Sequence, residues 1–255
     1  MNIFQAVILS LVEGITEFLP ISSTGHLILA SKLLNISQTE FVKSFEITVQ
    51  LGAILAVVVL YLKTLIIKTE IIKRIIAAFI PTAVLGFIFY SFIKHFLIGN
   101  LDVVVISLFV GGILMLVFEE VFKTKKGTET LENLSIRKSF LTGIIQSVSM
   151  IPGVSRAAAT IYAGLGVGLN RKSAVEFSFL LAVPTMLAAT ALDLFSVGFL
   201  FKSGEYLILA IGFIGAFISA MVTVKYLIGY IKKHSFRVFA VYRIILAVIF
   251  WLVFG

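Results

Sequence analysis

Two carboxylates lie four residues apart near the beginning of the sequence, within an otherwise apolar stretch. Glu13 and Glu17 belong to the segment EGITEFLPISSTGH, in which Pro20 is expected to end the helix that carries them. Side chains at this spacing share one face of a helix. Because hard divalent cations prefer oxygen ligands, the pair predicts a site for Mg²⁺ or Ca²⁺ with Glu13 and Glu17 as ligands.

Hydroxyl side chains and a histidine follow directly after the proline. Ser22, Ser23 and Thr24 suit the N-cap and first turn of a second helix, and His26 then lies within that turn. A helix N-terminus binds phosphate through its free N–H groups and its dipole. We therefore predict that Ser22 and Thr24 bind a phosphorylated substrate. Ser23, His26 or a water molecule activated by His26 attacks it, or His26 protonates the leaving group.

A second segment, IPGVSRAAAT, repeats this design with a cation in place of the acids. Pro152 and Gly153 break a helix, and Ser155 is expected to cap the next one. Arg156 supplies a planar fork of donors that binds two phosphate oxygens at once. Ser155 and Thr160 complete the predicted substrate-binding residues.

Charged residues inside apolar stretches need a reason, because each costs roughly 2.5–3.5 kcal/mol to insert into a membrane. In water, an acidic pair at helical spacing usually marks a solvated face, and a Ser-Ser-Thr run often only caps a helix. Inside a membrane the insertion cost favours a functional role for Glu13, Glu17 and Arg156. Two further acids, Glu46 and Glu176, either begin helices near an interface or bind the opposite segment.

The composition indicates an all-α polytopic membrane protein. Apolar residues make up 60% of the 255 residues, charged residues only 13%, and the mean hydropathy is +1.11. A soluble domain averages about a quarter charged residues. Apolar runs close to the length that crosses a bilayer predict six full transmembrane helices near residues 44–62, 75–93, 101–122, 175–201, 205–228 and 236–254.

The remaining features narrow the class further. The net charge of +8 does not indicate a nucleic-acid partner, because the basic residues lie in short connectors between the apolar runs. Lys225 and Arg243 fall near the ends of runs and are expected to anchor them at the interface. The chain has no cysteine, so disulfides are excluded. Its beginning lacks a basic n-region and a cleavage site, and we read it as mature protein.

Basic connectors alternate with nearly neutral ones, and this alternation predicts the direction of each span. The basic connectors, expected in the cytoplasm, lie near residues 63–74, 123–138 and 232–237. The nearly neutral connectors, expected outside, lie near residues 94–102 and 196–205. The runs that contain FEITVQLGA and VEFSFLLAV then cross in opposite directions although their sequences are alike, which is typical of an inverted-topology repeat.

We therefore predict a single membrane domain, residues 1–255, built from the repeat halves 1–125 and 135–255 with the polar cytoplasmic connector 123–138 between them. The interrupted stretches 3–34 and 139–169 must each begin and end on one side of the membrane. Their first arms are short for a span, so they predict two re-entrant helical hairpins. We expect the two polar segments to meet in one cavity that opens to the outer face.

The segment EGITEFLPISSTGHL resembles the first signature of the bacitracin-resistance family of undecaprenyl-diphosphatases. PGVSRAAAT resembles the second signature, P-G-x-S-R-S-x-x-T, and EFSFLLAVP and ALDL resemble other family segments, so the resemblance covers essentially the whole chain. One departure is Ala157, which stands where the family has Ser. That hydroxyl is therefore not available as a nucleophile or a ligand.

The resemblance implies an inverted repeat with re-entrant helices and a requirement for a divalent cation. It also implies hydrolysis of undecaprenyl diphosphate to undecaprenyl phosphate and phosphate at the outer side of the bacterial plasma (inner) membrane. This reaction recycles the lipid carrier for peptidoglycan synthesis and confers resistance to bacitracin. The oligomeric state is left open, and a homodimer is compatible with the sequence.

Two other functions fit parts of the pattern. A transporter that flips the polyprenyl phosphate carrier would also have inverted repeats and broken helices, but transport does not need two acids beside hydroxyls and a histidine. A lipid phosphatase of the phosphatidic-acid-phosphatase type needs a second histidine soon after the Ser-Arg pair. The next histidine is His234, far downstream, so that class is excluded.

Overall fold

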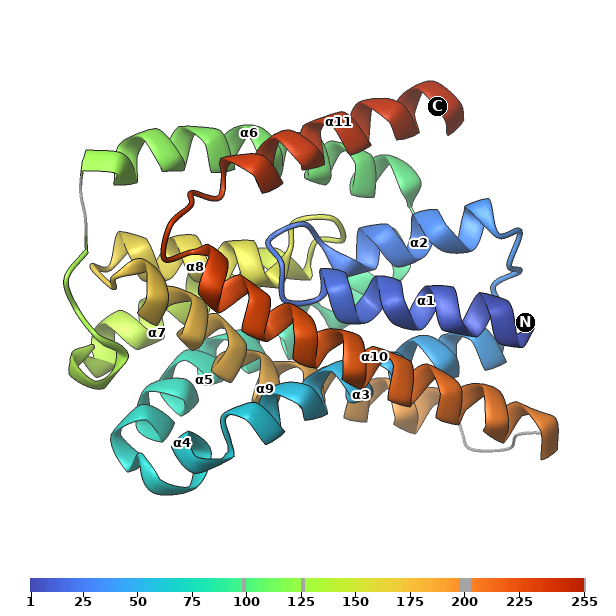
Figure 1. Ribbon diagram of the computed structural model, residues 1–255, viewed down its shortest axis with the longest axis horizontal. Helices are drawn as coiled ribbons and strands as arrows, with labels where there is room; N and C mark the ends of the chain where they lie inside the picture. The colour runs from blue at the N-terminus through green and yellow to red at the C-terminus, as the bar shows by residue number, and fades with distance from the viewer. Residues whose placement is uncertain (98–99, 125–126, 198–202, 255) are drawn as a thin grey trace.

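The computed structural model describes residues 1–97, 100–124, 127–197 and 203–254, and their regular structure is helical (Figure 1). Six of the described helices are long and apolar enough to cross a membrane. They are α3 (Glu40–Leu60), α5 (Thr69–Phe92), α6 (Leu101–Thr124), α9 (Arg171–Val197), α10 (Ser203–Tyr230) and α11 (Arg237–Phe254). The predicted spans are confirmed, except that residues 198–201 of one run lie outside the described residues.

Four shorter helices form two hairpins. Helices α1 (Ile3–Thr16) and α2 (Ser23–Leu33) pack against each other, as do α7 (Ile136–Gln146) and α8 (Arg156–Gly166). With 14 residues in α1 and 11 in each of the others, none reaches the roughly twenty residues of a full span. Short segments complete the chain: α4 (Leu62–Ile67), η1 (Ile93–Leu97), η2 (Leu131–Asn133) and η3 (Ser147–Met150).

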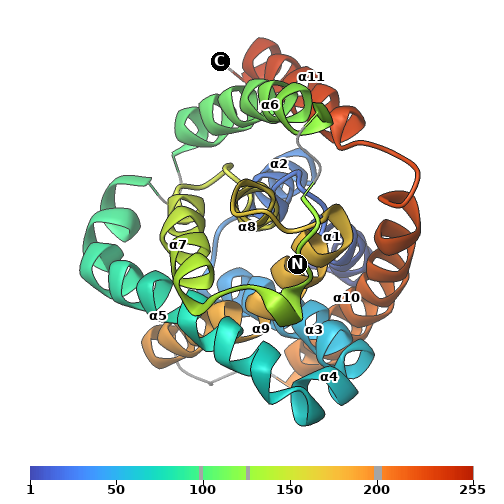
Figure 2. The same cartoon turned by 90° about the vertical axis from the view of Figure 1, so that its left-hand side faces the viewer.

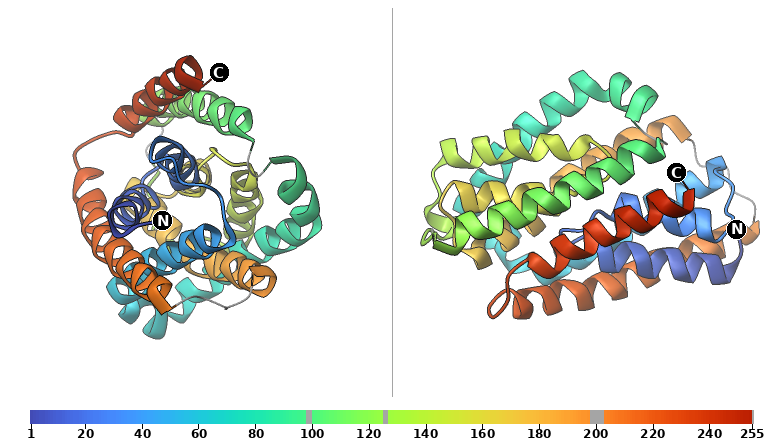
Figure 3. Two further views of the ribbon diagram at one scale, coloured as in Figure 1. Left: turned by 90° about the vertical axis from the view of Figure 1, so that its right-hand side faces the viewer. Right: turned by 90° about the horizontal axis from the view of Figure 1, so that it is seen from above.

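The two hairpins enter the molecule from opposite ends. In Figure 1, α1 begins at the right-hand end and α7 at the left-hand end, and both connecting loops lie near the centre. Figure 2 shows α2 and α8 in the middle of a ring of longer helices, with α1 and α7 beside them. Helices α6 and α11 run side by side across one side of this ring (Figure 3). The loops are therefore enclosed by protein, which irregular backbone at membrane depth requires.

Each hairpin packs on a long helix from the other half of the chain. Helix α1 packs on α10, and α7 packs on α5. Both contacts use a glycine: a Cβ at Gly14 would lie 2.6 Å from the carbonyl oxygen of Ala216, and one at Gly143 would lie 2.8 Å from the ring of Pro81. Each half also contributes two short helices followed by three long ones. This packing of each hairpin on the other half fits a repeat. The boundaries of the repeat halves stay a prediction.

The basic connectors lie together at one end of the molecule. Lys68 forms an ion pair with Glu132, and Arg74 donates to the carbonyl oxygen of Leu134 at 2.5 Å. Arg237 pairs with Glu120 at the end of α6. The pattern of Lys and Arg along the sequence therefore predicted correctly which connectors share a side. The assignment of that side to the cytoplasm stays a prediction.

Candidate active site

The loops of the two hairpins end in the same strained conformation. Ser22 and Ser155 have φ of 71° and 77°, and only one other described non-glycine residue, Asn35, has a positive φ. Each serine caps the helix that follows: the Ser22 Oγ accepts from the Gly25 N–H at 3.4 Å, and the Ser155 Oγ accepts from the Ala158 N–H at 3.1 Å. Both predicted N-caps are confirmed. Such backbone strain persists where the surrounding structure fixes it, often at functional sites.

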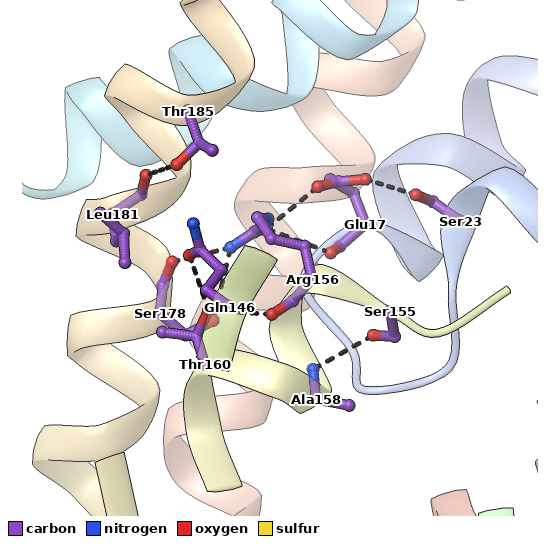
Figure 4. A network of polar contacts seen from close by, with 10 residues as sticks. All are labelled: Glu17, Ser23, Gln146, Ser155, Arg156, Ala158, Thr160, Ser178, Leu181 and Thr185. Atoms are coloured by element: carbon purple, nitrogen blue, oxygen red, sulfur yellow. Dashed lines mark hydrogen bonds and ion pairs between the residues drawn. The ribbon is translucent and has the colours of Figure 1, made fainter. Parts of the chain in front are cut away.

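The residues after these caps converge on one carboxylate. The Ser23 hydroxyl donates to Oε2 of Glu17, and Nη2 of Arg156 donates to Oε1 of Glu17 at 3.0 Å (Figure 4). All three side chains are largely buried. The prediction that the two polar segments meet is confirmed, because Glu17 and Arg156 are 139 residues apart in the sequence.

A residue of α9 holds the other arm of the arginine. Nη1 of Arg156 donates to the Ser178 carbonyl oxygen at 2.8 Å and reaches the Ser178 hydroxyl at 3.4 Å. The guanidinium also faces the ring of Phe18, 5.8 Å from its centroid. Nε of Arg156 has no partner among the described atoms. Ser178 was not among the predicted site residues, and its only signal in the sequence was its place in EFSFLLAVP.

Glu13 carries a fully buried carboxylate with both oxygens unpartnered. Its charged neighbours are Glu17, Glu46 and Arg156. An unpaired buried charge is costly, and a cation beside this carboxylate would relieve that cost. Among the described residues no group of three or more His, Cys, Asp or Glu side chains gathers around a metal position. The unpartnered oxygens of Glu13 would suit Mg²⁺, which is commonly held by one or two carboxylates plus substrate phosphates, and the divalent-cation site stays a prediction.

His26 lies apart from the Glu17 contacts. Its Nδ1 is 2.7 Å from the Ser22 carbonyl oxygen, and its Nε2 is 2.7 Å from the Tyr242 hydroxyl. The two rings are stacked, with centroids 5.5 Å apart. Thr24, in the same turn, is exposed. The structure therefore brings Ser23 to Glu17 and directs His26 toward α11.

Thr160 is fully buried and supports the turn that carries Arg156. Its hydroxyl lies 2.8 Å from Oε1 of Gln146 and 2.9 Å from the Arg156 carbonyl oxygen. Nε2 of Gln146 donates in turn to Thr82 at 3.1 Å. This hydroxyl is occupied by protein groups, so its contacts indicate a supporting role in place of the predicted substrate contact.

The structure shows the surroundings of two further charged residues, Glu176 and Arg243. Glu176 lies 3.7 Å from Lys172 and its side chain is 28% exposed, which fits a helix end near an interface. The prediction that Arg243 anchors at an interface is wrong: its side chain is fully buried and donates to backbone carbonyls. An apolar run does not show which way a cation within it points, so the sequence could not reveal this.

Comparison with known proteins gives a consistent result over the whole chain. The family model described as Bacitracin resistance protein BacA matches residues 6–249. The chain is 53% identical to the undecaprenyl-diphosphatase of Aquifex aeolicus, over 98% of each chain. It is 49% and 47% identical to those of Sulfurihydrogenibium sp. and Persephonella marina, over 99% of each chain.

Proposed function

The chain belongs to the bacitracin resistance protein family, and we propose that it removes the terminal phosphate of undecaprenyl diphosphate at the site formed by Glu17, Ser23 and Arg156. The relatives named above carry the name undecaprenyl-diphosphatase. One observation supports the assignment of the site most strongly: Ser23 and Arg156, each the first residue of a short helix, both contact the carboxylate of Glu17.

This arrangement suits phosphoryl transfer because it places a nucleophile, a base and a cation together. The Ser23 hydroxyl already donates to Glu17, so the carboxylate is placed to accept its proton. Arg156 binds phosphoryl oxygens through its planar fork and stabilises the charge that moves onto them in the transition state. The N-termini of α2 and α8 add free N–H groups for the same oxygens.

The reaction then proceeds in two balanced steps. The Ser23 oxygen bonds to the terminal phosphorus, the anhydride bond breaks, and its bridging oxygen leaves with undecaprenyl phosphate while Glu17 takes the serine proton. A water molecule next attacks the phosphoserine, the Oγ–P bond breaks as the Ser23 oxygen takes back the proton held by Glu17, and inorganic phosphate leaves with the protons of the water. Ser23 is favoured over His26 as the nucleophile, because both nitrogens of His26 have other partners.

A divalent cation, Mg²⁺ or Ca²⁺, would be held by Glu13 together with phosphate oxygens of the substrate. The cation would neutralise charge on the diphosphate when bound. Both oxygens of Glu17 have protein partners, whereas those of Glu13 have none. Glu13 would therefore supply the main protein ligand, and Glu17 would support it from the adjoining turn.

The apolar helices make this a multi-pass membrane protein, and we place it in the plasma (inner) membrane. The hairpins are proposed to be re-entrant, since their helices are too short to span. The first hairpin would admit the diphosphate from the outer face, because α1 and α2 enter from the end opposite the basic connectors. A homodimer stays a prediction.

The test is phosphate release by the purified protein in detergent, where no gradient exists. We expect metal-dependent release of one phosphate per undecaprenyl diphosphate, and loss of this activity with EDTA. Acid quenching in the presence of substrate labelled on its terminal phosphate should trap label on Ser23. A protein that bound the lipid but released no phosphate would contradict the proposal and revive the transporter alternative.

A further inference from the structure

Arg243 of α11 joins the two hairpin loops through its guanidinium group. Nη1 donates to the Pro20 carbonyl oxygen at 3.3 Å and to the Val154 carbonyl oxygen at 2.9 Å. Nη2 donates to the Gly153 carbonyl oxygen at 2.8 Å. One side chain therefore holds the backbone of the first loop just before Ser22 and the backbone of the second loop just before Ser155.

The same side chain ties both loops to a long helix. Nη2 donates to the Ser107 carbonyl oxygen at 3.0 Å, and Nε donates to the Leu108 carbonyl oxygen at 3.4 Å, both on α6. Gly111 on that helix makes room for the contact, because a Cβ there would lie 2.8 Å from Cζ of Arg243. The α6 and α11 pair thus forms a frame on which both loops are fixed.

No carboxylate forms an ion pair with Arg243 among the described residues. A fully buried arginine whose partners are five backbone carbonyls and the Met115 sulfur, with no counter-charge, is expensive to place inside a membrane. Arginine has a rigid fork of five donors, whereas lysine has a compact ammonium that cannot span three backbone segments at once. The five carbonyl contacts use this fork fully. Bulk charge alone would not require it.

From this geometry we infer that Arg243 is a positioning residue for the phosphatase reaction, which sets the relative placement of Ser23 and Arg156 by clamping the two loops together. This inference rests on the proposed function. Arg243 touches backbone that leads into the site and acts through Ser23 and Arg156. A small displacement of reacting groups, on the order of 1 Å, costs as much as about a hundredfold in rate. Loss of the Arg243 contacts should therefore lower kcat more than it changes KM.

Two variants test the clamp in different ways. Arg243→Lys keeps the charge and removes the fork, while Gly111→Ala leaves the arginine intact and pushes its guanidinium away. We expect each to lower kcat at least about tenfold with KM within about threefold of the parent. Lysine lacks the guanidinium fork at every pH, so the loss of kcat in Arg243→Lys should persist across the pH profile.

Matched controls separate positioning from general destabilisation. Arg171→Lys alters a half-buried arginine that pairs with Glu119 at 2.9 Å and does not contact the loops. Gly229→Ala adds a methyl group where nothing lies within 4 Å. Both controls should keep the parental kcat. Thermal unfolding in detergent measures stability for all four variants.

Three outcomes would overturn the inference while leaving the proposed function standing. The first is a parental kcat in folded Arg243→Lys and Gly111→Ala. The second is an equal loss of kcat in the two control variants. The third is failure of both Arg243→Lys and Gly111→Ala to fold, which would make the role of Arg243 purely structural. Absence of phosphate release by the parent protein would instead contradict the proposed function.

Discussion

Replacing Arg156 by lysine should lower kcat/KM strongly, although the positive charge is retained. The guanidinium bridges Glu17, at 3.0 Å from Nη2, and the Ser178 carbonyl oxygen, at 2.8 Å from Nη1. A lysine ammonium is a point charge on a flexible stem and cannot keep both contacts while it binds a phosphate. The side chain is only 11% exposed, so water does not replace the lost partner.

The size of the effect follows from the hydrogen bonds lost. A hydrogen bond to a charged group contributes about 1.5–3 kcal/mol, which corresponds to roughly 10- to 150-fold in rate. We expect kcat/KM for undecaprenyl diphosphate to fall by this factor in Arg156→Lys, measured as phosphate release in detergent. Arg171→Lys, which changes a half-buried, ion-paired arginine away from the loops, is the matched control. Equal activity of Arg156→Lys and the parent would show that Arg156 supplies only charge and that its guanidinium geometry is not needed.

Further predictions concern Glu13, Thr160 and Glu119. Glu13→Gln should weaken the apparent affinity for Mg²⁺ at least about tenfold in a metal titration of activity, and an unchanged titration curve would remove Glu13 from the metal site. Thr160→Val should lower the free energy of unfolding by about 1–3 kcal/mol, because Gln146 loses its partner; a raised KM with unchanged stability would instead make Thr160 a substrate contact. Glu119→Gln should destabilise by about 1–3 kcal/mol, since the half-buried Arg171 loses its charged hydrogen-bond partner, and thermal unfolding checks this against an unchanged KM.

The sequence predicted the parts of the fold that depend on local chemistry and on the membrane. Six spans follow from apolar length, and the caps at Ser22 and Ser155 follow from residue types beside helix breakers. The meeting of the two polar segments was also predictable, because neither Arg156 nor the acid pair could be left alone in a membrane.

The remaining features depend on partners that are distant in the sequence. His26 is tied to Tyr242, 216 residues away, and nothing in its own segment indicates this. Arg243 looked like an interface anchor because a periodic apolar run does not reveal which neighbours lie behind it. Its hydrogen bonds go mainly to backbone carbonyls. Because every residue has a backbone carbonyl, residue types do not indicate which ones will bind an arginine.

Ser23, Glu17 and Arg156 are proposed to act as one unit on the terminal phosphate. The most direct measurement is a double-mutant cycle of Ser23→Ala and Arg156→Ala, scored as kcat/KM for phosphate release from undecaprenyl diphosphate. Residues that act as a unit are strongly non-additive, so each single variant should lose at least about a hundredfold, and the double variant should lose little more than the worse single one. Parental turnover in Ser23→Ala, or losses that simply multiply in the double variant, would contradict the account.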